Sequence, residues 1–260
     1  MERPGDEPTT PVPTATTTKT GERPAATAPR DNRWSPAIII LGIAAVAYVI
    51  YKLPPYLSLD PANSRIPPEH PLHFALLSGH VLAGSIALLT PVIQFWPWLR
   101  RKYPTLHRIS GRIYVFAGAL PSAVLAISMY PVTHGPGRVA VLAASILWTY
   151  TALLGLLTAR RKQYAAHRRW MVYSYAIMWG YGVWVFVYAN LFVTLGISIP
   201  TAVEAARWGG WTSNLLIAHW WLERTAGRTI AGGVKRRTPK KSPSTTPQPT
   251  AHSTPAPAAP

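Results

Sequence analysis

Long apolar stretches recur along the chain, and short polar or basic segments separate them. An α-helix needs about 20 predominantly apolar residues to cross the hydrocarbon core of a bilayer. The predicted spans are Pro36–Leu53, His73–Trp96, Arg108–Tyr130, Arg138–Thr158, Trp170 to about Gly196, and Glu204–Leu222. The last is the least apolar, and an amphipathic helix lying on the membrane surface is the alternative for it. The pattern predicts an all-α, polytopic transmembrane helix bundle of about six spans.

A basic motif occurs twice between these stretches. Arg-Arg-Lys, four further residues and His-Arg stand at 100–108 and again at 160–168. We call these segments the first elbow and the second elbow. Each elbow follows one apolar stretch and precedes another, which indicates an internal repeat of a two-helix unit. His107 and His167 occupy the same position in the two copies.

The two ends of the chain differ in composition from the apolar part. Residues 1–35 and 223–260 are polar and rich in Pro and Thr, so we expect both to be disordered. The segment 36–53 is predicted to be an extra N-terminal membrane helix, and 72–222 the core of the bundle.

Composition supports a membrane protein and narrows its chemistry. Hydrophobic residues make up 48% of the chain and charged residues 13%, whereas soluble domains average about 25% charged. The absence of cysteine excludes disulfides and thiol catalysis. None of the nine acidic residues lies in the middle of an apolar stretch, which argues against an ion-coupled transporter. No hydrolase or phosphate-loop motif is present, so the sequence does not decide whether the protein is an enzyme.

The net charge of +17 follows the predicted topology. With six spans, 22 of the 26 Lys and Arg residues fall on the side that holds both termini and both elbows. Cytoplasmic loops carry such an excess of Lys and Arg. We therefore expect a protein of the cytoplasmic membrane with both termini in the cytoplasm, and the basic charge does not require a nucleic-acid partner.

The elbow histidines lead to the first functional hypothesis. His107 and His167 begin spans that run in the same direction, so their rings should lie at similar depth. Haem iron accepts two imidazoles from facing helices. The hypothesis is a haem b electron-transfer protein that exchanges electrons with a quinone or another redox partner. Gly111 would leave room for the porphyrin, one turn after His107. The arginines that could pair with the propionates include Arg108, Arg112 and Arg168.

The alternative is that both elbows anchor the protein at the membrane surface. His and Arg at a helix start suit the headgroup layer, and Arg binds lipid phosphates in a bidentate manner. The protein would then be a non-catalytic, lipid-interacting scaffold or a small-molecule carrier, with anionic headgroups as partners of the elbows. A metal site formed by His107, His167 and His219 is a further alternative.

His80 lies about two turns inside the second predicted span. An ionisable side chain at this depth requires a partner. The candidates are a backbone carbonyl or hydroxyl on a neighbouring helix, which would make His80 a packing residue, or a bound ligand.

The motifs around these histidines resemble a known family. The resemblance rests on His80 with Gly84, on His-Arg-x-x-Gly-Arg-x-Tyr at 107–114, and on His-Arg-x-Trp-Met at 167–171. In these features the run 72–190 resembles a family of predicted bacterial membrane proteins, domain of unknown function 2306. The resemblance implies a multi-pass bundle. In its helical histidines alone, the chain is also loosely similar to b-type cytochromes and ferric reductases.

Overall fold

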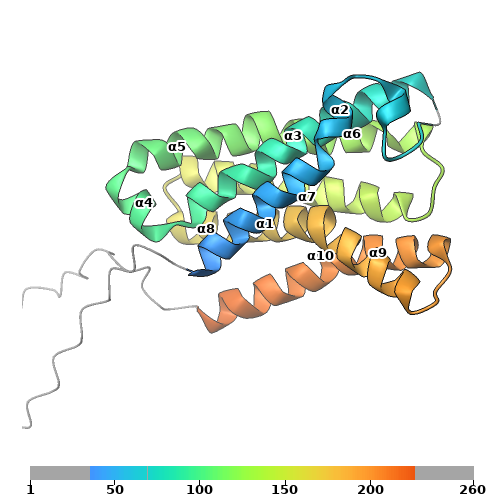
Figure 1. Cartoon of the computed structure of the whole chain (residues 1–260). Coiled ribbons are helices and arrows are strands. Elements are labelled where there is room, and N and C mark those ends of the chain that lie inside the picture. The colour runs from blue at the N-terminus through green and yellow to red at the C-terminus, as the bar shows by residue number, and fades with distance from the viewer. Residues whose placement is uncertain (1–35, 69, 226–260) are drawn as a thin grey trace, which may run out of the picture. The chain divides into compact units, whose positions relative to one another are not determined.

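The computed structural model describes residues 36–68 and 70–225, and its regular secondary structure over these ranges is helical (Figure 1). The helices are α1 (Pro36–Lys52), α2 (Pro54–Leu57), α3 (Pro71–Phe95), α4 (Pro97–Lys102), α5 (Pro104–Ile113), α6 (Leu120–Ser128), α7 (Arg138–Arg160), α8 (Tyr164–Trp179), α9 (Val185–Thr194) and α10 (Ile199–Arg224). Two π-helical segments, η2 (Tyr114–Ala119) and η4 (Gly180–Trp184), join α5 to α6 and α8 to α9. Short 3₁₀ turns lie at Pro61–Asn63 and Tyr130–Val132. The segments expected to be disordered lie almost entirely outside the described residues.

Four helices of the described part are long and apolar enough to cross a membrane. They are Pro71–Phe95, Pro104–Val132, Arg138–Arg160 and Tyr164–Thr194. A shorter apolar helix, Ile38–Lys52, precedes them. These segments coincide with the first five predicted spans, so the prediction of an all-α bundle with several membrane-length helices is confirmed.

The last helix, α10, lies antiparallel to the continuous α8–η4–α9 helix. Near the start of α8, Arg169 contacts Glu223. Further along, a Cβ added to Gly180 would lie 2.5 Å from the carbonyl oxygen of Gly210. The buried side of α10 carries small residues four positions apart, Ala202, Ala206 and Gly210. The helix is therefore packed along the bundle, although it is not among the four that meet the hydropathy of a candidate span.

The outward-facing side chains of the bundle are largely apolar. Large hydrophobic residues with at least two-fifths of their surface exposed occur on every long helix, among them Ile40, Ile43, Leu82, Phe116, Val124, Ile146, Leu157, Leu191, Leu216 and Ile217. A folded protein in water rarely exposes such large contiguous apolar surfaces. Surrounding hydrocarbon removes this cost, so the exposed surface agrees with the length of the helices.

Small residues bring α3 and the α5–η2–α6 helix into backbone contact. The second and third predicted spans each carry small residues at four-residue spacing, a pattern that predicts the close approach of a neighbouring helix. These two stripes, Gly79, Ala83, Ala87 and Gly118, Ser122, Ala126, face each other. A Cβ on Gly118 would lie 2.9 Å from the backbone nitrogen of Ala87. Close approach through small residues is how membrane helices gain packing energy. The prediction that these stripes admit a neighbouring helix is confirmed.

The described part of the chain has two distinct ends (Figure 1). One end, which we call the elbow end, holds both elbows, the start of α1 and the end of α10; the opposite, loop end holds α2 and the α6–α7 and α9–α10 connections. Proline fixes the first turn of both helices of the first elbow, at Pro97 and Pro104. The second elbow turns at Lys162, whose φ of 58° is left-handed.

Substitution of Gly118 tests the contact between α3 and the α5–η2–α6 helix. We expect Gly118→Ala to destabilise the bundle by about 1–3 kcal/mol, because its Cβ would overlap the backbone of Ala87. Gly182→Ala is the matched control, since a Cβ there would meet no atom within 4 Å, and its effect should be below about 1 kcal/mol. Unfolding in mixed micelles measures both changes. Equal losses at the two positions would contradict the packing described here.

Candidate functional site

His80 forms a hydrogen bond with a backbone carbonyl on a neighbouring helix. This is one of the partners expected for an ionisable side chain at its depth. Its Nδ1 lies 2.8 Å from the carbonyl oxygen of Ser122 and 3.0 Å from the Ser122 hydroxyl. The hydroxyl in turn donates to the backbone carbonyl of His80 over 3.1 Å. Gly84 allows this approach, since a Cβ there would lie 3.2 Å from the hydroxyl oxygen. A carbonyl oxygen only accepts hydrogen bonds, so Nδ1 of His80 carries a proton and Nε2 of the neutral ring is an acceptor.

His80 also forms part of the wall of a cavity of about 340 Å³, which we call the His80 cavity. The cavity lies among α1, α3, α7, the α8–α9 helix and α10. Most of its wall is apolar; these residues include Leu77, Val81, Leu88, Ile177, Met178, Val185 and Phe186. The ring hydrogen bonds of His80 to described residues both involve Nδ1, so Nε2 remains free to bind another group. Ligand pockets typically measure about 300–1,000 Å³ and are mostly apolar with few polar groups, and the His80 cavity fits that description.

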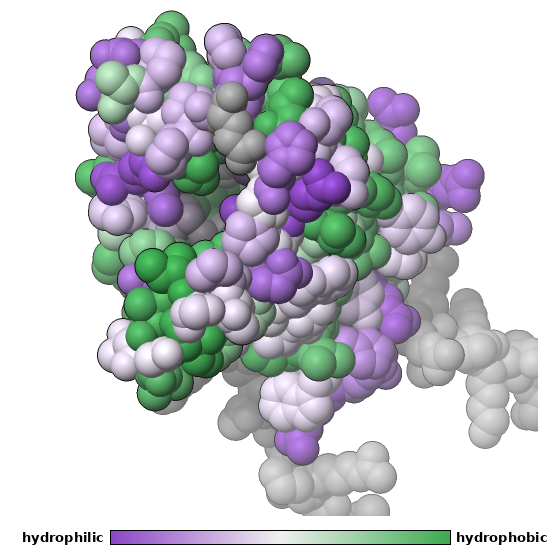
Figure 2. All heavy atoms as spheres, turned by 90° about the vertical axis from the view of Figure 1, so that its right-hand side faces the viewer, coloured by the Kyte–Doolittle hydropathy of each residue, from purple (hydrophilic) through white to green (hydrophobic). Residues whose placement is uncertain are grey.

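The lining of the His80 cavity reaches the loop end, and two of its residues there, Lys52 and Arg207, are cations. Lys52 Nζ lies 5.0 Å from the centre of the Phe186 ring, and Arg207 donates a hydrogen bond to the carbonyl of Pro136. No carboxylate of the described residues lies within ion-pair distance of either cation. Figure 2 looks onto this end and shows polar residues around a hollow. An apolar interior with cations at its mouth is complementary to an amphipathic anion.

The two repeat units meet in the core beneath this cavity. The hydroxyl of Tyr114 lies 2.6 Å from that of Ser174, a residue 60 positions later and therefore its counterpart in the repeat. The indole of Trp148, which also lines the cavity, donates to the Tyr114 oxygen over 3.1 Å. The neighbouring Tyr175 hydroxyl is buried with no partner among the described residues. The repeat thus supplies a buried polar contact, which its sequence spacing alone did not predict.

The two elbow histidines lie near each other at the elbow end. His167 Nδ1 is 2.8 Å from the carbonyl oxygen of Gly155, so it donates there and leaves Nε2 as an acceptor. His107 lies within electrostatic range of His167 and Arg100. Its Nδ1 is buried and has no partner within the described part of the chain. A carbonyl that fixes the tautomer is typical of metal-ligating histidines, and His167 has this feature.

The side chain of Gln94, which no sequence motif indicated, fills the space beside Gly111. Gln94 donates to the His107 carbonyl over 2.8 Å and also to the Ser110 hydroxyl. A Cβ on Gly111 would lie 3.6 Å from the Gln94 amide. A porphyrin beside Gly111 would therefore require the Gln94 side chain to move. The imidazoles of His107 and His167 are groups that can bind haem iron.

The predicted arginines have different environments. Arg108 and Arg112 are exposed, and Arg108 donates a hydrogen bond to the Thr105 hydroxyl over 3.4 Å. Arg168 stacks on Trp221, 4.7 Å from the ring centre, and donates to Thr225. Arg168 also lies within electrostatic range of Arg100 in the first elbow. Burial, together with the charges of Arg101 and Arg168, lowers the pKa of the Arg100 guanidinium below its usual value. The elbows thus meet as a cluster of cations.

A metal site built from His107, His167 and His219 is not found. No group of three or more potential ligands that could hold a metal ion is present in the described ranges 36–68 and 70–225. His219 instead pairs with Tyr173, whose hydroxyl lies 2.9 Å from its Nδ1. The packing of α10 directs this histidine to α8, and the sequence alone did not define that packing.

Comparison with known proteins places these features in a family. No curated protein and no solved structure matches the chain. The family described as "Predicted membrane protein (DUF2306)" matches residues 77–222. This range is more than half of the chain and contains His80, both elbows and most of α10. The protein therefore belongs to the DUF2306 family of predicted multi-pass membrane proteins, the family that its histidine motifs resemble.

Proposed function

We propose that this protein is a membrane-embedded carrier that binds a small amphipathic anion in the His80 cavity. The observation that carries the proposal is the His80 ring, which Ser122 binds through Nδ1 and which lines a mostly apolar cavity. The apolar body of an organic acid would replace water against this wall. Its carboxylate would lie toward Lys52 and Arg207, which no described carboxylate neutralises.

His80 would set the hydrogen-bonding specificity of the cavity. With Nδ1 donating to Ser122, the neutral ring accepts a hydrogen bond at Nε2 from an O–H or N–H of the occupant. A protonated ring would instead donate to a carboxylate. The π-helical segments support a role for this region, since such irregularities often occur at functional sites. Gly182 of η4 lines the cavity, and its carbonyl accepts a hydrogen bond from Tyr48 of α1.

We further propose six membrane spans with the elbow end in the cytoplasm. In this arrangement α10 is the sixth span, which its antiparallel packing along α8–η4–α9 supports. The elbow end carries both basic elbows, whereas Lys52, Arg65, Arg138 and Arg207 belong to the loop end. The positive-inside rule then places the elbows and both termini in the cytoplasm, at the cytoplasmic membrane.

Binding of octanoate to the purified full chain tests the carrier proposal. We expect octanoate to raise the melting temperature of the protein, because it binds the folded state and not the unfolded state. His80→Asn keeps a donor for the Ser122 carbonyl but removes Nε2, and it should weaken binding about tenfold, a loss of about 1.4 kcal/mol. Lys52→Gln should weaken it about fivefold, through loss of about 1 kcal/mol of electrostatic attraction.

Two controls accompany this measurement. Lys102→Gln makes the same charge change at the elbow end and should leave octanoate binding unchanged. Octanol lacks the carboxylate and should bind more weakly than octanoate. The proposal fails if octanol binds as well as octanoate, or if His80→Asn and Lys52→Gln both bind octanoate like the unaltered protein.

A second candidate function is electron transfer through haem b held between His107 and His167. The observation that favours it is the hydrogen bond from His167 Nδ1 to the Gly155 carbonyl, which leaves Nε2 to face a ligand. When bound, haem would supply one-electron chemistry with a quinone or another redox partner. Arg168 and Arg100, which lie within electrostatic range of each other, would neutralise its propionates.

The visible spectrum of protein produced with haem available tests this candidate. We expect a haem absorbance that either His107→Ala or His167→Ala abolishes, because each removes one of the two imidazoles that would hold the iron. His219→Ala is the control and should keep the absorbance, since His219 pairs with Tyr173. A colourless preparation of the unaltered protein would rule the candidate out.

A further inference from the structure

A groove on the outside of the bundle is separate from the His80 cavity. It measures about 450 Å³ and lies between α7, α8 and α10, with Leu147, Trp170, Leu216 and His219 in its wall. Two threonines of its wall do not make it polar, because both hydroxyls donate to carbonyls of their own helices: Thr151 to Leu147 over 2.9 Å and Thr212 to Trp208 over 2.7 Å. The groove therefore offers an almost entirely apolar surface that opens to the hydrocarbon.

The groove begins at the elbow end and runs toward the middle of the bundle. Its α10 wall extends from His219 back to Trp211, a distance of about 12 Å at the rise of an α-helix. This direction is parallel to the helices, as a lipid acyl chain would be in a bilayer. Leu216 is 70% exposed, so the groove is open from the side.

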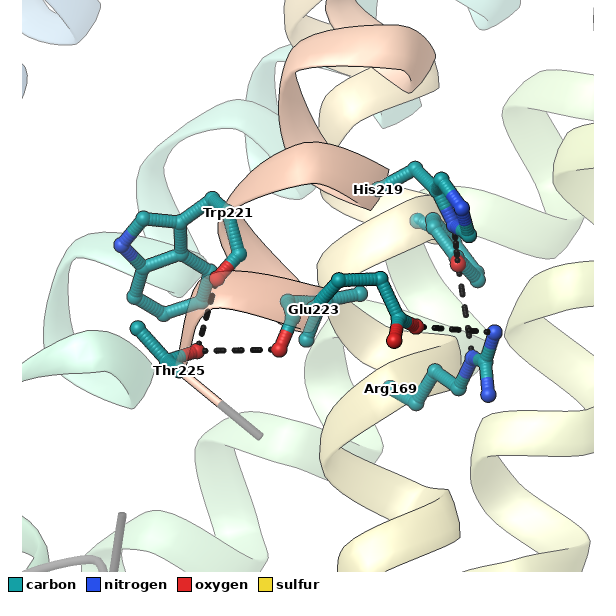
Figure 3. A network of polar contacts seen from close by, with 7 residues as sticks. Arg169, His219, Trp221, Glu223 and Thr225 are labelled. Carbon is teal, nitrogen blue, oxygen red and sulfur yellow. Dashed lines mark hydrogen bonds and ion pairs between the residues drawn. The ribbon is translucent and has the colours of Figure 1, made fainter. Parts of the chain in front are cut away.

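A polar network closes the elbow end of the groove (Figure 3). Arg169 Nε donates to the Tyr173 hydroxyl over 3.3 Å, and the hydroxyl lies 2.9 Å from His219 Nδ1. Arg169 also lies 3.5 Å from the carboxylate of Glu223. The Tyr173 oxygen accepts from Arg169 and can donate its own proton to His219 Nδ1; in that arrangement the neutral ring of His219 carries its proton on Nε2. Arg169 and His219 both present donors at the mouth of the groove.

The surroundings of this mouth are strongly basic. At the same end of the bundle, the second elbow carries Arg160, Arg161, Lys162 and Arg168, the residue before Arg169, and α10 ends with Arg224. Glu223 is the one carboxylate among residues 160–169 and 219–225. An anion is favoured at such a site, and phosphate is the anion that Arg binds with the best geometry.

We propose that this groove holds one acyl chain of an anionic phospholipid, whose phosphate binds Arg169 and His219. The acyl chain would cover the apolar wall from Trp170 to Trp211, and the headgroup would lie in the basic surroundings of the second elbow. The lipid enters sideways from the bilayer, because the groove opens to the outside of the bundle. The site does not depend on the His80 cavity or on haem.

Trp211 indicates the alternative occupant of the groove. Its indole nitrogen is buried and has no acceptor among the described residues, and the residue lies at the inner end of the groove. An apolar molecule with a carbonyl oxygen, such as a quinone, would accept that hydrogen bond. The charges at the mouth favour the phospholipid, and the two occupants depend on different residues.

Native mass spectrometry of the full chain, released from nanodiscs that contain phosphatidylcholine and phosphatidylglycerol, tests the proposal. We expect one retained phosphatidylglycerol in preference to phosphatidylcholine. Arg169→Gln should lower its retention about fivefold, the effect of one arginine near an anionic surface. Glu223→Gln should maintain or increase retention, because it removes the competing carboxylate. Leu216→Trp should block the groove and lower the retention of both lipids.

Ile217→Trp is the matched control, since Ile217 is the next residue of α10, is 62% exposed and does not line the groove. It should retain phosphatidylglycerol like the unaltered protein, and helical circular dichroism confirms that each variant is folded. Equal retention of the two lipids, or equal effects of Leu216→Trp and Ile217→Trp, would overturn the proposal. So would loss of a bound molecule in Trp211→Phe together with its retention in Arg169→Gln, since that result identifies a carbonyl-bearing occupant.

Discussion

Hydrocarbon around the helices is the constraint on which the rest of this structure depends. Within a bilayer, a buried polar group cannot turn to water, so it must find its partner inside the protein. Ser85, Thr90 and Thr158 meet this demand by donating to carbonyls of their own helices. Tyr114, Trp148 and Ser174 meet it by bonding to each other. Buried groups left without a partner among the described residues, such as the indole nitrogen of Trp211, are therefore candidates for binding another molecule.

Small residues determine where such groups can meet. Hydrophobic burial does not bring helices together in lipid, so close backbone packing has to do so. Gly118 against Ala87 positions Ser122 close enough to bind His80. Gly180 against Gly210 draws α10 onto η4, which completes the wall of the His80 cavity. The same helix forms one side of the outer groove. Both sites thus follow from close contacts between helices.

The sequence predicted the membrane-length helices well, because hydrocarbon thickness fixes the length of an apolar stretch. The stripes that end at Ala87 and Ala126 also identified the correct contact. The docking of α10 was not predicted, although Ala202, Ala206 and Gly210 carry the same four-residue signal. Hydropathy weakened that signal, since the helix also carries Glu204 and Arg207.

The candidate sites were predictable only in part. Sequence identified His80, His107 and His167, because histidine is unusual in apolar helices and the elbow repeat drew attention to two of them. It did not identify Gln94, which fills the space beside Gly111, since a single Gln at a helix end has no distinctive spacing. The His80 cavity is lined from α1 through α10, so no local motif encodes it. Its existence depends on how the helices pack.

The most direct test of this account is the accessibility of its two ends across the membrane. The natural chain contains no cysteine, so one introduced thiol reports one position. Gly135→Cys lies at the loop end, where an added Cβ meets no atom within 4 Å, and Gln163→Cys lies in the second elbow. With the elbow end in the cytoplasm, a membrane-impermeant maleimide should label Gly135→Cys in intact cells and Gln163→Cys only after permeabilisation. Labelling of both in intact cells, or the reverse order, would contradict a bundle that crosses the membrane in this orientation.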